Sequence, residues 1–191
     1  MLKNNRIYPV IAAVPELEKN LKGRDKVQTL SQLARYALEI SCQKSGIILG
    51  VLDKDQNGAP VPFDGNFWSV THKSEYAGGV VAKKATGFDI EKIKPVSKAL
   101  IDKVAGHKEW ALSDSGKEIN FFRFWTAKEA VLKASGKGIS GLSDCSIEKI
   151  IDDKSLIVKY NNQKQEVWHY FFDGHIASIV NNGFDIEWTL L

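Results

Sequence analysis

The sequence contains only two cysteines, Cys42 and Cys145, and no long run of apolar residues. Two cysteines without metal-ligand spacing cannot form a disulfide framework or a zinc finger, so both are expected to be reduced thiols outside any site. The lack of a long apolar run excludes an ordinary transmembrane helix. The first twenty residues also lack the apolar core and cleavage site of a secretory signal, so we expect a cytoplasmic location.

The sequence also has little excess of charge. Its 26 Lys and Arg residues oppose 23 Asp and Glu residues, which gives a net charge of +3. This balance is too small for the basic surface typical of nucleic-acid-binding proteins, so we expect neither nucleic acid nor a membrane as partner. With 191 residues, 43% of them hydrophobic, the chain can form one large domain or two small ones.

Hydrophobic periodicity predicts a mixture of long helices and short strands. Apolar residues recur at helical spacing over residues 24–45, and Gly46 is a plausible stop. A second long helix is expected over residues 121–135, with Asn120 as its N-cap and Gly136 after its end. A shorter helix is expected at 96–104, a loop at 53–65, and strands at 47–52, 67–71, 78–83, 87–91 and through much of the remainder.

Two patterns occur twice along the chain. The pentapeptide GFDIE stands at residues 87–91 and again at 183–187, and the Ala-x-Glu and Ser-Gly pairs of residues 127–136 have counterparts in 37–46. Repetition of this kind predicts two related halves. The expected fold class is α+β, with pseudo-symmetric αβ halves at residues 1–94 and 95–191, each a small, mainly antiparallel sheet carrying a long helix, and with the active-site cleft between them.

Charged side chains converge in two of these elements. Alternation along a strand sends Asp89 and Glu91 to the same face, and a pair of carboxylates at close range suits Mg²⁺. On the second long helix Glu129 and Lys133 share one side with Trp125. Taken singly, a solvated strand end and an ordinary helical ion pair explain these features better. Their joint occurrence with hydroxyls and cations in SVTHK, residues 69–73, points to a phosphate-binding cleft.

These three segments together resemble the 4′-phosphopantetheinyl transferase family. WTAKEAVLKASGKG at residues 125–138 is similar to the family's W-[ST]-x-K-E-x-x-x-K-x-x-G-x-G, GFDIE to its G-[IV]-D-[IL]-E, and SVTHK to its short Ser-His segment. The length and the internal repeat resemble the larger, two-halved surfactin-type class, which implies a monomer.

The resemblance implies transfer of phosphopantetheine from coenzyme A to a serine of an apo acyl or peptidyl carrier protein, with release of 3′,5′-ADP. It implies that Asp89, Glu91 and Glu129 hold Mg²⁺, and that Glu129 or a metal-bound water takes the serine proton. Lys133 and His72 would bind phosphate oxygens. The coenzyme-binding set expected on this basis is Thr71, His72, Lys128, Lys133, Lys137 and Arg24. Lys128 lies about 100° around the helix from Glu129, so it is given a neighbouring role.

The sequence departs from the family at two coenzyme-contacting positions. Ala59 stands in Gly-Ala-Pro where the family often has Gly-Lys-Pro, and Gln28 stands where many members have Arg, so Arg24 or Lys26 would have to substitute. These departures leave open a catalytically silent coenzyme A or nucleotide binder of the same fold. A Mg²⁺-dependent phosphohydrolase is a third possibility.

The second GFDIE predicts a vestigial twin of the site. Its carboxylates would be Asp185, Glu187 and Glu39, and Gln43 and Phe172 would stand opposite Lys133 and His72. Such a twin lacks cations for a pyrophosphate, so it is expected to be inactive.

Overall fold

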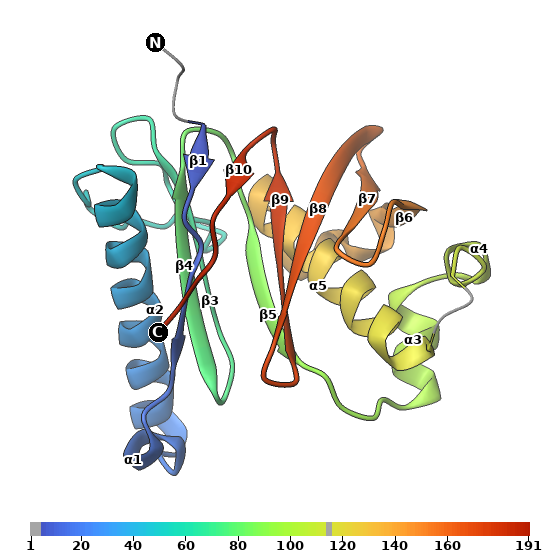
Figure 1. The fold of residues 1–191 in the computed structure, drawn as a ribbon, viewed down its shortest axis with the longest axis horizontal. Helices are drawn as coiled ribbons and strands as arrows, with labels where there is room; N and C mark the ends of the chain where they lie inside the picture. Colours follow the sequence, from blue (N-terminus) through green and yellow to red (C-terminus); the bar gives the residue numbers. More distant parts are fainter. Residues whose placement is uncertain (1–4, 114–115) are drawn as a thin grey trace.

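Three β-sheets and two long helices make up the described part of this computed structural model, residues 5–113 and 116–191 (Figure 1). The helices are α1 (Glu16–Lys19), α2 (Gly23–Ser45), α3 (Lys98–Val104), α4 (His107–Trp110), α5 (Lys117–Ser135) and the 3₁₀ helix η1 (Gly138–Asp144). The strands are β1 (Arg6–Ile7), β2 (Val10–Ala13), β3 (Phe67–His72), β4 (Tyr76–Ala82), β5 (Phe88–Lys92), β6 (Cys145–Ile150), β7 (Ser155–Tyr160), β8 (Gln163–Phe172), β9 (His175–Asn181), β10 (Asp185–Ile186) and β11 (Thr189–Leu190). The α+β class predicted from the sequence is confirmed.

The first long helix, α2, covers a four-stranded sheet of order β11-β2-β4-β3. It buries Leu30, Ala34 and Leu38 on one stripe, as its apolar spacing predicts. The packing is close because β4 carries Gly79 at the crossing, where a Cβ would lie only 2.5 Å from the Leu38 backbone nitrogen. The helix ends at Gly46, whose positive φ of 66° closes the last turn.

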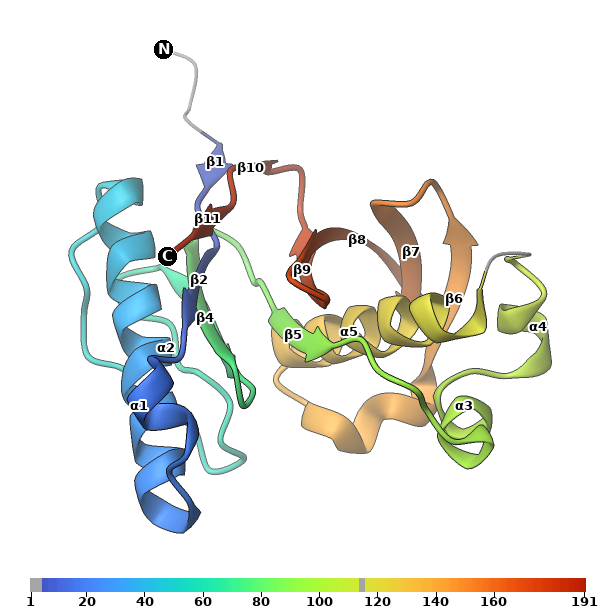
Figure 2. The ribbon, with the colours of Figure 1, turned by 60° about the horizontal axis from the view of Figure 1, so that its bottom comes forward.

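The second long helix, α5, runs along the inner face of a curved five-stranded antiparallel sheet of order β5-β9-β8-β7-β6 (Figure 2). Phe124, Ala127 and Val131 are fully buried against this sheet. The helix begins at Lys117, earlier than the sequence predicts, and Asn120 is a buried residue inside it that donates to Ser113 Oγ at 2.7 Å. The expected N-cap role of Asn120 is therefore wrong, because the aromatic cluster is preceded by a further turn of helix.

The strands cross the expected boundary at residue 94. β5 precedes it, yet β5 pairs antiparallel with β9, so that Asp89 stands opposite Ser178. β10 and β11 come from the end of the chain, yet they pair parallel with β1 and β2. Each lobe, meaning a long helix with its sheet, is thus completed by strands from the other part of the sequence.

Residues 47–52, which the sequence predicts as a strand, are irregular. Their apolar side chains Ile47, Leu49 and Leu52 instead pack on the cluster around Trp68 and Phe63. The prediction was wrong because the side chains of an apolar run can be buried against a helix end and a loop as well as in a sheet. Among the described helices, none combines the length and the apolar character needed to cross a membrane.

Candidate active site

A cavity of about 340 Å³ lies where the two lobes meet, and we call it the junction cavity. Its walls come from α2, the segment after it, β3, β5 and α5. The lining residues are Ser31, Ala34, Arg35, Leu52, Lys54, Trp68, Val70, Thr71, His72, Lys73, Asp89, Glu129 and Lys133. The site thus joins side chains from β5 and from the C-terminal part of α5 with the end of β3, which are the three segments that the sequence motifs select.

Asp89 is the most deeply buried acid of the cavity, with 3% of its surface exposed. Its Oδ1 accepts hydrogen bonds from Thr71 Oγ1 at 3.0 Å and from Lys133 Nζ at 2.8 Å. Its Oδ2 is buried and has no hydrogen-bond partner among the described residues. A buried carboxylate oxygen without a donor is costly, so this atom is suited to accept a cation or a donor brought by a ligand.

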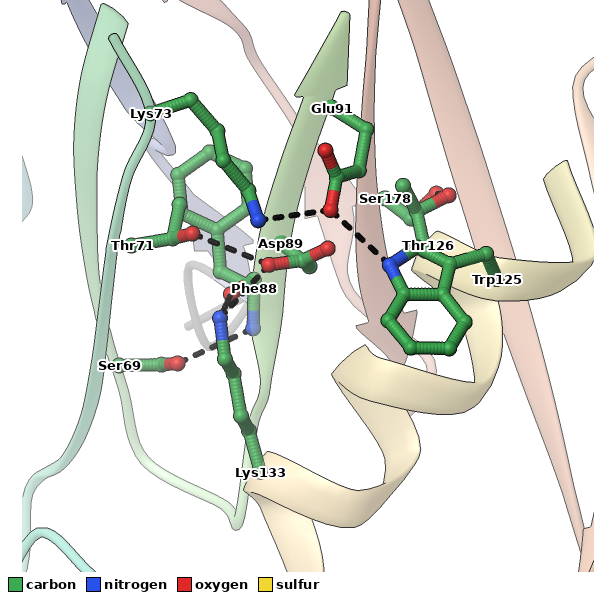
Figure 3. A network of polar contacts seen from close by, with 10 residues as sticks. All are labelled: Ser69, Thr71, Lys73, Phe88, Asp89, Glu91, Trp125, Thr126, Lys133 and Ser178. Atoms are coloured by element: carbon green, nitrogen blue, oxygen red, sulfur yellow. Dashed lines mark hydrogen bonds and ion pairs between the residues drawn. The ribbon is translucent and has the colours of Figure 1, made fainter. Parts of the chain in front are cut away.

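Glu91 lies two residues along β5 and is also held through one oxygen. Its Oε1 accepts from Trp125 Nε1 at 2.9 Å and forms an ion pair with Lys73 Nζ at 2.7 Å (Figure 3). The β5 backbone is fixed beside it, because Phe88 N donates to Ser69 Oγ and Phe88 O accepts from Lys133. SVTHK, GFDIE and the α5 motif therefore form a single polar network.

Two groups of the site have pKa values moved by this network. Burial and, next, the charge of Asp89 raise the pKa of the Glu129 carboxyl, which brings it closer to a useful range for proton transfer. Burial opposes charge on Lys73, but its hydrogen bond to Glu91 and the charges of Asp89, Glu91 and Glu129 outweigh burial and raise the pKa of Lys73.

His72 lies at the rim of the cavity, where its side chain is largely exposed. Partial burial lowers the pKa of His72, and the positive charges of Lys133, Lys73 and Lys54 lower it further. At a given pH, a larger fraction of His72 is therefore neutral than of an isolated histidine, and an anion in the cavity would reduce this difference.

The chemistry of the carboxylates fits Mg²⁺, although they are not assembled as a metal site. In residues 5–113 and 116–191, no three His, Cys, Asp or Glu side chains lie together in a way that could hold a metal ion. The ammonium groups of Lys133 and Lys73 are bound to Asp89 and Glu91 instead. Mg²⁺ prefers hard oxygen ligands, and the carboxylates of Asp89, Glu91 and Glu129 are of this kind. The Asp89 Oδ2 atom, which has no hydrogen-bond partner among the described residues, could serve as one such ligand.

Lys128 does not belong to this site, which corrects the prediction that it contacts a coenzyme. It is 2% exposed and points into the second lobe, where its Nζ donates to Val104 O at 2.6 Å and pairs with Glu109 at 2.7 Å. The one-residue step from Glu129 turns its side chain toward α3 and α4 rather than toward the junction cavity.

The remaining predicted cations, Arg24 and Lys137, are exposed and are not among the residues that line the cavity. The lining cations that the sequence reasoning missed are Arg35 on α2 and Lys54 on the following segment. Arg35 could have been found, because residues 24, 28, 31 and 35 follow a single stripe of the helix. Lys54 has no such signal, since its segment is irregular.

The second GFDIE has a different environment. Arg6 pairs with Asp185 at 2.7 Å and with Glu187 at 3.1 Å, and Lys44 lies 3.7 Å from Glu187. The twin was predicted to lack cations for a pyrophosphate, with Gln43 and Phe172 opposite Lys133 and His72, and that stays a prediction. Arg6 and Lys44 come from other positions and are already paired with these carboxylates. Among the described residues, Glu39, Asp185 and Glu187 do not form a group that could hold a metal ion, so the proposed twin set of three carboxylates has no support.

Comparison with known proteins shows the family of this chain. The family model described as the 4′-phosphopantetheinyl transferase superfamily matches residues 85–180, just over half of the chain. The matched region contains GFDIE and the whole of α5, and it ends within β9.

Several curated proteins are similar in sequence. The 4′-phosphopantetheinyl transferase psf-1 of Bacillus pumilus is 34% identical over 100 residues, 49% of this chain and 43% of its own length. The 4′-phosphopantetheinyl transferase gsp of Aneurinibacillus migulanus is 26% identical over 134 residues, 65% of this chain and 55% of its own length. This chain thus spans about half the length of these two relatives. A Haemophilus influenzae protein is 28% identical over 169 residues, 83% of this chain and 71% of its own length.

Proposed function

Since the chain belongs to the 4′-phosphopantetheinyl transferase superfamily, we propose that it transfers 4′-phosphopantetheine from coenzyme A to a serine of an apo acyl or peptidyl carrier protein. The serine oxygen attacks the phosphorus that carries the pantetheine, and the bond to the departing 3′,5′-ADP breaks. The observation that carries the proposal is the junction cavity itself. It brings the buried Asp89 and the half-buried Glu129 within one network of cations, which is what a pyrophosphate and an attacking hydroxyl require.

The proton of the carrier serine would pass to Glu129. Its carboxylate faces the cavity, and its raised pKa makes it a better base than an exposed glutamate. Lys133 and His72 would bind phosphate oxygens, and Thr71 keeps Asp89 oriented by donating to its Oδ1. These groups stabilise negative charge as it moves onto the departing nucleotide.

Asp89, Glu91 and Glu129 would hold Mg²⁺, with the unpartnered Asp89 Oδ2 as one ligand atom. When bound, Mg²⁺ neutralises pyrophosphate charge and acts as a Lewis acid. Trp125 would keep Glu91 oriented by the hydrogen bond from its indole N–H, which is held in place by α5. The indole is neutral, so it would not repel a bound metal ion.

The coenzyme's other phosphates would meet Arg35 and Lys54. Both line the cavity, whereas Ala59 and Gln28, which stand at the usual contact positions, do not. Arg24 lies further along the same stripe of α2, toward the helix start, and can contact only a part of the coenzyme that extends beyond the cavity. Lys137 follows the C-terminus of α5 and can contact only a part of the coenzyme that extends beyond the cavity at that end of the helix.

We also propose that the two lobes are pseudo-symmetric halves, divided near residue 94 along the chain, with β5 and β10–β11 exchanged between them. The reciprocal strand exchange supports this relation. It would place the cleft where one exchanged strand, β5, passes between the helices. A monomeric state and a cytoplasmic location stay predictions.

The transfer is tested by incubating the protein with an apo carrier protein, coenzyme A and Mg²⁺, and measuring the intact mass of the carrier. We expect a phosphopantetheine adduct with the wild type, and a rate about 100-fold or more lower for Glu129→Gln, the scale of losing a general base. Glu118→Gln on the exposed first turn of the same helix is the matched control and should retain the wild-type rate.

Two outcomes of this assay would contradict the proposal. Coenzyme A binding without any adduct on several carriers would favour a silent coenzyme or nucleotide binder. Release of 3′,5′-ADP in the absence of a carrier, at the rate seen in its presence, would favour a phosphohydrolase. The carrier and its pathway are to be identified by the same assay with carriers of different type.

A further inference from the structure

Lys73 is a charged residue of the junction cavity that neither the family motif nor the proposed reaction assigns. It follows the last residue of β3, where its backbone N–H donates to Tyr76 O at 2.7 Å and starts the turn into β4. Its side chain reaches across to β5 and ends on Glu91 Oε1 at 2.7 Å (Figure 3). The lysine therefore neutralises a carboxylate that the proposed function gives to Mg²⁺.

We propose that Lys73 is an exchangeable counter-ion: it holds Glu91 in the metal-free protein and leaves that carboxylate when a divalent cation binds. The inference rests on the proposed function, since it concerns the same carboxylates. A monovalent ammonium at hydrogen-bond distance from Glu91 would be repelled by a divalent cation on the same group.

The two donors on Glu91 differ in their freedom to leave. Trp125 is anchored in α5, and its indole is neutral, so its hydrogen bond to Oε1 is compatible with a bound cation. Lys73 is at the start of a turn, its side chain is 39% exposed, and it has four rotatable bonds. It also lines the junction cavity, so on leaving Glu91 its ammonium can turn toward an incoming phosphate.

Lys133 has a different position. Its Nζ is bound at once to Asp89 Oδ1 and to Phe88 O, and its side chain is 27% exposed. Asp89 has a second oxygen, the buried and unpartnered Oδ2, that can receive a cation without breaking the contact with Lys133. The exchange is therefore assigned to Lys73 rather than to Lys133.

The test is direct measurement of divalent-cation binding to the protein alone, by calorimetry with Mg²⁺ and by electron paramagnetic resonance with Mn²⁺. Lys73→Met removes the competing charge, so we expect the cation to bind about fivefold more tightly, which is the upper end of the range for one partly exposed ion pair. Lys73→Arg keeps the charge and should bind the cation with an affinity close to that of the wild type. Lys92→Met is the matched control, because Lys92 is adjacent on β5 but pairs with Glu75, and it should change the affinity less than twofold.

A second readout follows the lysine itself. Limited acetylation and mass spectrometry should show Lys73 protected in metal-free protein and modified several times faster when Mg²⁺ is added, while Lys92 changes little. Equal cation affinity in wild type and Lys73→Met, or no cation binding by either, would overturn the counter-ion proposal. The transfer assay is scored separately, so an active wild type with no Lys73 effect contradicts this inference and leaves the proposed function standing.

Discussion

The buried pair of Lys128 and Glu109 allows a decisive test of what the family motif lysine does in this chain. Lys128 is 2% exposed, and it has two partners, Val104 O at 2.6 Å and Glu109 Oε1 at 2.7 Å. Glu109 also accepts from Ile147 N and from Gly106 N, each at 2.8 Å. The pair thus ties α5 to the connection between α3 and α4 and to β6.

The two single substitutions should destabilise the protein by different amounts. Glu109→Gln removes the negative charge that balances the buried Lys128 ammonium, and loss of the charge of one partner of a buried pair typically costs about 3–5 kcal/mol. Lys128→Met costs less, about 1–3 kcal/mol, because Met fills most of the volume and Glu109 keeps its two backbone donors. The double variant should lose less stability than the sum of the two single losses.

Urea unfolding followed by tryptophan fluorescence measures these differences, and Trp110 lies close enough to report them, since its ring packs on Phe124 at 5.0 Å. Coenzyme A affinity is measured on the same variants under conditions where they remain folded. We expect it to stay within about twofold for Lys128→Met, because the side chain is outside the junction cavity. A wild-type unfolding midpoint together with a large loss of coenzyme affinity would refute this reasoning and restore Lys128 to the site.

Three further predictions concern the junction cavity and the packing of α5 beside it. Because the pKa of Glu129 is raised in the folded protein, its charge opposes folding above that pKa but not below the unfolded value. Glu129→Gln should therefore stabilise the protein at neutral pH and leave its stability unchanged in acid, as urea unfolding at two pH values will show. An anionic ligand favours protonated His72, so coenzyme binding should take up a proton and weaken as pH rises through the bound-state pKa. Calorimetry in two buffers of different ionisation enthalpy should show this for the wild type and not for His72→Gln. Gly87→Ala would put a Cβ 1.8 Å from Ala130 O, so it should lower the free energy of unfolding by about 3 kcal/mol. At Gly116 an added Cβ would meet no described atom within 4 Å outside its own stretch of chain, so Gly116→Ala should be neutral in the same urea assay.

Local elements of the fold could be predicted because short-range physics determines them. The helix α2 has an apolar stripe, whereas α5 buries residues on most of its circumference, and each helix ends at a glycine with positive φ, Gly46 and Gly136. Residues 47–52 could not be assigned in the same way, because an apolar run is satisfied equally by a sheet and by packing against a loop. There Gly50 lies so close to Phe63 that a Cβ would be 2.7 Å from its ring, a contact that no local pattern signals.

The candidate site was predictable in its carboxylates and only partly in its cations. Asp89, Glu91 and Glu129 follow from strand alternation and helix spacing, together with the resemblance of their motifs to a known family. The cations depend on which segments meet across the cavity. Lys54 lines the cavity from an irregular segment. Lys128 lies outside the site because its ammonium pairs with Glu109, which belongs to a different helix. Such partners are fixed by tertiary packing, which periodicity does not encode.

The two copies of GFDIE provide an internal comparison of what makes a carboxylate pair functional. In the first copy, β5 is covered by α5 and joined to β9, so Asp89 is buried with one oxygen unpartnered. In the second copy, the pairing is limited to two residues, and the Asp185 side chain is 63% exposed and bound to Arg6. An exposed pair already bound by an arginine has little to gain from a cation, because water and the guanidinium satisfy it. The buried Asp89 oxygen has no such partner among the described residues. That difference, rather than the shared pentapeptide, is the reason for proposing that the reaction takes place in the junction cavity.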